Sequence, residues 1–122
     1  MNQRSSVNIA LIVVATLLGL AAAVSASGKV KRLPQVVETM HSVGVTDQQM
    51  KGLAGLEFLG SLGLLVGIWI PILGVLAALG LTVYFLGAII AHVRAKQGFA
   101  EALPSVGLTV LALATLILEL NR

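Results

Sequence analysis

Hydrophobic residues along the chain are gathered into four long runs, separated by short polar stretches. The runs cover residues 7–26, 53–70, 72–91 and 103–118. Each is close to the roughly 17 to 25 residues that an α-helix needs to cross a bilayer. The first run contains Val24-Ser25-Ala26, which resembles a signal-peptidase site, but it is longer than the roughly 7 to 15 apolar residues of a secretory signal. The pattern therefore predicts four membrane-spanning helices, with the first retained.

A shorter amphipathic pattern fills the polar stretch between the first and second runs. Pro34 suits the first turn of a helix, and apolar residues recur behind it at helical spacing. Gly44 is a typical helix terminator, and Thr46 with Gln49 forms the pattern of a capping box. We therefore expect an interfacial helix over about 34–43, between spans 1 and 2.

The composition agrees with a membrane protein. Of the 122 residues, 57% are hydrophobic and 11% are charged, and the mean hydropathy is +1.00. These values exclude an ordinary soluble globule. The chain has no cysteine, which excludes disulfides, thiol redox relays and thiolate metal sites. The predicted fold is a single all-α domain over residues 1–122, an integral membrane four-helix bundle with a short interfacial helix.

Basic residues are divided unequally between the two ends of the predicted bundle. One end carries Arg4 and Arg122, and the other carries Lys29, Lys31, Arg32, Lys51, Arg94 and Lys96. The more basic side of a membrane protein usually faces the cytoplasm. We therefore expect residues 27–52 and 92–102 on the cytoplasmic side of the plasma membrane (the inner membrane of a bacterium) and both termini outside. Basic residues that are not interleaved with aromatic ones give no sign of nucleic-acid binding.

A carboxylate, Glu57, lies inside the second apolar run, where an ionisable residue indicates a functional site by default. Lys29 ends a stripe of small residues on the first helix, and Arg94 ends a similar stripe on the third. Because Pro71 predicts a tight turn, Glu57 should lie near the level of residues 88–92. We expect at least one of Lys29 and Arg94 to hold Glu57 ionised in a buried polar cluster.

Three further polar residues, Tyr84, His92 and Ser25, form a candidate ligand pocket beside this cluster. A histidine and a buried acid suit proton exchange with a bound headgroup. A purely structural cluster explains the same residues, so both interpretations stay open. Haem is disfavoured, because the chain has only two histidines and His41 lies in the interfacial segment. No metal site and no catalytic residue are assigned.

Many short motifs resemble the DoxX-like family in order and spacing. They are Ser27-Gly28-Lys29, Leu33-Pro34, Val43-Gly44-Val45, Gly55-Leu56-Glu57, Gly63-Leu64-Leu65, Gly67, Trp69, Pro71, Gly74, Ala77-Ala78, Gly80-Leu81, Tyr84-Phe85, Gly87-Ala88 and His92-Val93-Arg94. The resemblance covers roughly residues 15–96 and implies a four-helix membrane bundle. The family's recurrent polar positions map onto Lys29, Glu57, His92 and Arg94.

The resemblance also implies two kinds of function, because founding members look like small subunits of a thiosulfate:quinone oxidoreductase and others assist larger membrane assemblies. Glycine stripes and a scant extramembrane chain favour a non-catalytic accessory subunit of a transporter or respiratory enzyme. Its partners would be lipids and other subunits or a second copy. The alternative is a quinone- or lipid-binding redox subunit, which leaves quinone as an open cofactor. A small-solute transporter is disfavoured because the chain lacks broken helices and internal repeats.

Overall fold

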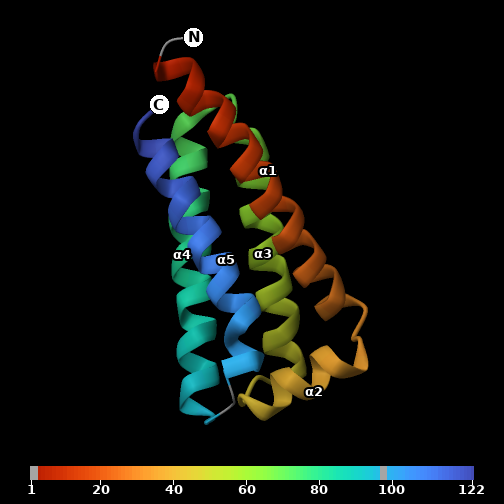
Figure 1. Cartoon of the computed structure of the whole chain (residues 1–122). Helices are drawn as coiled ribbons and strands as arrows, with labels where there is room; N and C mark the ends of the chain where they lie inside the picture. Colours follow the sequence, from red (N-terminus) through yellow and green to blue (C-terminus); the bar gives the residue numbers. More distant parts are fainter. Residues whose placement is uncertain (1–2, 97–98) are drawn as a thin grey trace.

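The computed structural model describes residues 3–96 and 99–122, and the side chains of residues 6–96 and 103–122. The described residues form five helices: α1 (Gln3–Val30), α2 (Pro34–Ser42), α3 (Asp47–Val66), α4 (Pro71–Arg94) and α5 (Phe99–Leu120). The four long helices run side by side, and α2 lies across one end (Figure 1). The predicted all-α class is confirmed. The Arg4 side chain and residues 97–98 of the predicted loop lie outside the described residues.

Within the described part of the chain, three helices are long and apolar enough to cross a membrane. The segments are Ser6–Val30 of α1, Pro71–Arg94 of α4 and Leu103–Leu120 of α5. The helix α3 is not among them, because its first turns are polar and because Glu57 lowers its hydropathy further. Three membrane-compatible helices are therefore established, and a fourth span remains a prediction.

The ends of α2 and α3 follow from local sequence. Pro34 begins α2, and Gly44 ends the segment with a φ of 84°, a left-handed conformation that glycine adopts without strain. At the start of α3, Gln49 N donates to Thr46 Oγ1 at 3.1 Å and Thr46 N donates to Gln49 Oε1 at 3.0 Å. This reciprocal pair is the predicted capping box, and it is confirmed.

Two predicted boundaries are wrong. The helix α3 ends at Val66, four residues before the predicted end at Ile70. Ile70 is extended (φ −120°, ψ 94°), as expected for a residue that precedes proline. The last helix, α5, begins at Phe99 rather than at residue 103, so that Pro104 lies inside it. The ring costs α5 one backbone hydrogen bond, because proline has no N–H to donate.

The long helices pack in a ring in which α1 and α4 each contact both α3 and α5. The central core consists of Leu18, Ala22, Leu64, Ala78, Leu81, Phe85 and Ala112. On α1, the predicted stripe runs through Ala15, Leu18, Ala22, Ser25 and Lys29, and all are buried except Ser25, which is half-buried. Many other leucine, isoleucine and valine side chains point outward, as expected for helices surrounded by lipid rather than water.

Glycines on α3 and α4 serve opposite purposes. On α3, an added Cβ at Gly60 would come within 2.7 Å of Leu81, and one at Gly63 within 2.9 Å of Ala77. These glycines let α4 approach α3 closely. On α4, an added Cβ at Gly80 or Gly87 would meet nothing within 4 Å. Gly80 and Gly87 therefore do not pack against another described helix, although Tyr84 between them packs on the core.

Candidate functional site

A buried ion pair joins α1 to α3 near the α2 end of the bundle. Lys29 Nζ lies 2.5 Å from Glu57 Oε1, and it also donates to Ser25 Oγ at 2.9 Å. The Glu57 side chain is 0% exposed and that of Lys29 is 8% exposed. Charges so far from water are stable only when they are paired and hydrogen-bonded. The structure thus brings together two of the three residues of the predicted cluster.

Helical spacing explains why the two charges meet. Glu57 lies on the same face of α3 as Ala54, Ser61 and Leu64, all of which are buried. Ser61 Oγ donates to the Gly19 carbonyl of α1 at 3.0 Å and to the Glu57 carbonyl at 3.0 Å. Sequence reasoning did not single out Ser61, although its position one turn after Glu57 signals the same face. This serine adds a second polar link between α1 and α3.

A tyrosine of α4 lies near the Glu57 carboxylate. Oε2 is buried and makes no hydrogen bond of ordinary geometry within the described residues. The Tyr84 hydroxyl approaches the Glu57 carboxylate as a side-chain donor. Tyr84 therefore brings α4 to the ion pair, so that three helices meet at one carboxylate.

Arg94, the third predicted member of the cluster, lies elsewhere. Its side chain is exposed, and Lys29 is the basic residue that pairs with Glu57. The expectation that at least one of the two basic residues pairs with Glu57 is met by Lys29. Arg94 is too far away, because Glu57 precedes Ile70 by 13 residues and Tyr84 follows Pro71 by 13 residues. The tight turn therefore places Glu57 level with Tyr84 rather than with residues 88–92. Ten further residues of helix separate Tyr84 from Arg94, a distance of about 15 Å along the axis. An arginine side chain cannot span it.

A large cavity adjoins Lys29. Its volume is about 960 Å³, and its walls come from the end of α1, from α2, and from α4 and α5. The candidate pocket residues Ser25, Tyr84 and His92 all line it, and Lys29 does as well. His92 is 6% exposed. Most of the remaining wall is hydrocarbon, so the arrangement offers a few polar groups at one side of an apolar space.

A second ion pair lies at the opposite end of the bundle. Arg122 Nη2 is 3.0 Å from Glu119 Oε2, and the same guanidinium donates to the carbonyls of Gly67 and Ile68 at the end of α3. The Glu119 carboxylate packs directly on Gly74, where an added Cβ would overlap it. The sequence predicted Arg122 at this end of the bundle and gave no role to Glu119. Glu119 follows Ala112 and Thr115 on one buried face of α5, which is the signal that was missed.

An exposed network ties α2 to its neighbours. Asp47 Oδ1 lies 2.8 Å from His41 Nε2 and 3.2 Å from Arg32 Nη1. Hydrogen bonds from His41 and then from Arg32 hold the pKa of Asp47 below its ordinary value. The network links the end of α1, the end of α2 and the start of α3, and so fixes α2 across the end of the bundle.

Among the described residues, no three His, Asp or Glu side chains gather closely enough to hold a metal ion. The chemistry that the site does offer is hydrogen bonding. Lys29, Ser25, Tyr84 and His92 present donors and acceptors to the cavity, while the only buried acid beside it, within the part of the chain described, is neutralised by Lys29.

Comparison with protein-family models matches residues 13–115 to the DoxX-like family. Neither the curated proteins nor the solved structures contain a match to the chain. The matched range covers well over half of the chain and includes Lys29, Glu57, Tyr84 and His92. The family match agrees with the presence of three helices that have the length and composition of membrane spans. The chain is thus a membrane protein that belongs to the DoxX-like family, as the order of its motifs predicted.

Proposed function

We propose that this membrane protein is a non-catalytic accessory subunit of a larger membrane complex, such as a transporter or a respiratory enzyme. The proposal rests on α4, where Gly80 and Gly87 are exposed and an added Cβ would meet nothing within 4 Å. Bare glycine backbone lets a second helix approach closely in a bilayer. Packing within the chain accounts for Gly60 and Gly63 but not for these two.

The state of the buried carboxylate supports a non-catalytic role. Glu57 is fully buried and bound by Lys29, so it has no access to a substrate proton. A general base must come within hydrogen-bonding reach of the proton that it removes. Its contacts with α1 and α4 instead suit a residue that holds three helices in register.

Purification of the native chain in a gentle detergent tests this role. We expect cross-linking before solubilisation, followed by mass spectrometry, to recover the chain with one or more other membrane proteins. A lone species of the monomer's mass after cross-linking would contradict the proposal. A homo-oligomer would contradict it too, since the open glycines of α4 would then serve copies of the same chain.

We also propose that α3 crosses the membrane as the fourth span. It runs beside α1 along the bundle and turns directly into α4 (Figure 1), and both neighbours have the length and composition of spans. Pairing with Lys29 reduces the cost of placing Glu57 in the membrane, since an unpaired charge at a helix centre costs about 2.5 to 3.5 kcal/mol on insertion scales. A four-span bundle in the plasma membrane follows.

The orientation of this bundle is proposed from its charges. Lys31, Arg32, Lys51, Arg94 and Lys96 are exposed at the α2 end, which should therefore be cytoplasmic. Because the chain has no cysteine, Gln48→Cys and Asn121→Cys each carry a single thiol at an exposed position. We expect an impermeant reagent to label Asn121→Cys from outside and Gln48→Cys only after permeabilisation. The reverse pattern would refute the orientation.

The cavity favours a second candidate function, a quinone- or lipid-binding redox subunit. His92 and Tyr84 line the cavity, and Tyr84 also reaches Glu57. Such groups could exchange protons with a bound redox headgroup. A redox-active molecule that purifies with the chain, and whose reduction is slowed in His92→Gln, would favour this function over the first. An optically silent preparation would favour the accessory role.

A further inference from the structure

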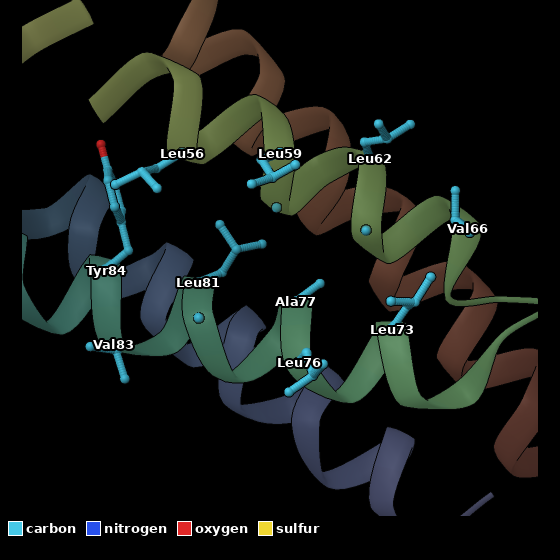
Figure 2. Close-up of a pocket in the computed structure, with 13 residues that line it drawn as sticks. Leu56, Leu59, Leu62, Val66, Leu73, Leu76, Ala77, Leu81, Val83 and Tyr84 are labelled. Carbon is cyan, nitrogen blue, oxygen red and sulfur yellow. The ribbon is translucent and has the colours of Figure 1, made fainter. Parts of the chain in front are cut away.

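An apolar groove on the surface of the bundle continues the cavity toward the bilayer. The groove lies between α3 and α4 and has a volume of about 640 Å³. Figure 2 shows Leu56, Leu59 and Leu62 along its α3 side and Leu81 and Tyr84 along its α4 side. Val83 and Tyr84 line both the groove and the cavity, so the two spaces meet at these residues.

The two spaces differ in polarity. The groove is walled by leucine, valine, alanine and glycine, and Tyr84 is its one polar side chain. The cavity adds Ser25, Lys29, Gln35, Thr39, His92 and Ser105. A molecule that fills both would therefore need a hydrocarbon chain at one end and a hydrogen-bonding head at the other. Each volume falls within the range of about 300 to 1,000 Å³ that ligand pockets usually have.

The hydrogen bonds and the charge of Lys29 indicate which kind of ligand head the cavity accepts. An ammonium group has three N–H donors, and Lys29 uses two of them, on Glu57 and Ser25. One donor is therefore left for a ligand oxygen, on a side chain that is more than nine-tenths buried and lines the cavity. The positive charge, however, is already balanced by Glu57. An anionic head would bring an uncompensated charge into an apolar space, which is costly.

The position of the groove defines the route of access. Leu56 and Leu59 on α3 and Leu76 and Val83 on α4 are each more than half exposed, and they border the groove. The α2 end of the cavity is instead covered by Val36, Met40 and their neighbours on α2. A molecule can reach the cavity sideways from the bilayer, with its chain remaining between α3 and α4.

We propose that the cavity and groove together bind one chain-bearing amphiphile with an uncharged, oxygen-bearing head. The ketone, ester or hydroxyl oxygen of the head accepts a hydrogen bond from Lys29, and the hydrocarbon chain lies along α3 and α4 past Tyr84. An isoprenoid ketone and a neutral lipid share this chemistry. Because Gly80 and Gly87 line these spaces, a bound amphiphile is an alternative to a partner helix on the same surface of α4. The inference rests on the second candidate function, so its failure would remove that function and leave the accessory role standing.

Two glycine substitutions can block this site without straining the fold. Gly80 lines the groove and Gly87 lines the cavity, and neither has an atom within 4 Å of an added Cβ. Gly80→Leu and Gly87→Leu should therefore fill the two spaces separately while raising helix propensity. Gly107→Leu on α5 is the matched control, because Gly107 is equally open and lines neither space.

The experiment is purification of the full chain in a gentle detergent, followed by native mass spectrometry and identification of the extracted molecule. We expect wild type and Gly107→Leu to retain about one uncharged amphiphile per chain, and each blocking variant to retain about tenfold less, equivalent to a loss of about 1.4 kcal/mol in binding. Ultraviolet absorbance and mass then separate a redox-active ketone from a neutral lipid, and either supports the proposal.

Three outcomes would overturn it. Wild type could retain nothing, all four proteins could retain the same mixture as the bulk membrane, or the retained molecule could be an anionic phospholipid. Thermal melts accompany each preparation, so that a variant counts only if it melts within a few degrees of wild type. If one blocking variant fails this check, the other decides, since the two leucines occupy different spaces.

Discussion

Each end of the bundle buries a carboxylate against a basic residue, but the surroundings of the two pairs are opposite. At the α2 end, Lys29 and Glu57 lie 28 residues apart and border a cavity of about 960 Å³. At the other end, Glu119 and Arg122 lie three residues apart on one chain end. There Gly74 lets the carboxylate pack against α4 with no room for a Cβ.

The placement of glycine accounts for this difference. Near the α3–α4 turn, the small residues Gly63, Gly67, Gly74 and Ala77 face one another across the two helices, and the helices touch. Toward the α2 end, α4 has Gly80 and Gly87 on its surface with no helix packed on them among the described residues, and α3 presents leucines. Paired small residues close the end near the α3–α4 turn, here called the closed end. Unpaired ones leave the α2 end open, here called the open end.

The largest expected effect comes from breaking the ion pair at the open end. Lys29→Gln would leave Glu57 buried without its charged partner, and loss of one member of a buried pair costs about 3 to 5 kcal/mol. Thermal and denaturant melts in detergent measure this loss. Lys31→Gln is the control, because Lys31 is exposed beside the same helix end. Equal stability of the two variants would show that the pair does not hold the bundle.

An intermediate effect is expected from filling the closed end. An alanine Cβ at Gly67 would overlap the backbone of Gly74, which cannot move aside as a side chain can. Overpacking of this kind costs about 1 to 3 kcal/mol. Gly55→Ala within α3 is the control, because a Cβ there meets nothing within 4 Å and alanine should stabilise the helix by up to about 1 kcal/mol. Opposite shifts in melting temperature are expected, and shifts of the same sign would refute the packing.

The smallest effect concerns the exposed network that holds α2 over the cavity. Hydrogen bonds from His41 and Arg32 lower the pKa of Asp47 below its ordinary value of 3.8. A lowered pKa stabilises the fold above the ordinary value and stops doing so as the pH falls through the folded value. We expect Asp47→Asn to be slightly less stable than wild type at pH 7, because exposed pairs contribute little. The difference should begin to shrink as the pH falls below 3.8 and disappear below the lowered pKa of the folded state. A difference that grows in acid would contradict this.

Much of the open end could be predicted from the sequence, because local rules govern it. Thr46 and Gln49 cap α3, and Lys29 continues the stripe of small residues on α1 at helical spacing. Glu57 is a lone acid in an apolar run, and it takes the basic residue at the end of the neighbouring helix as its partner. The cap and the stripe depend on positions within one or two turns of a helix, and the pairing follows because a buried charge needs an opposite charge nearby.

The remainder depends on geometry that a sequence does not state. Arg94 was expected too close to Glu57, although the turn at Ile70–Pro71 sets side by side the residues that are equally far from it. Glu57 therefore lies beside Tyr84, well before Arg94. The packing of Glu119 on Gly74 joins residues far apart in the chain. The cavity likewise results from how α2 crosses the bundle, and no short motif encodes that crossing.

The central claim, that Lys29 and Glu57 act as one neutralised unit at the open end, is tested most directly by a double-mutant cycle. Lys29→Met, Glu57→Gln and the double variant would be compared with wild type by equilibrium unfolding in the same detergent. We expect the double variant to be more stable than Lys29→Met alone, because removing both charges leaves no buried ion without a partner. Costs of the two single variants that simply add in the double variant would contradict the claim.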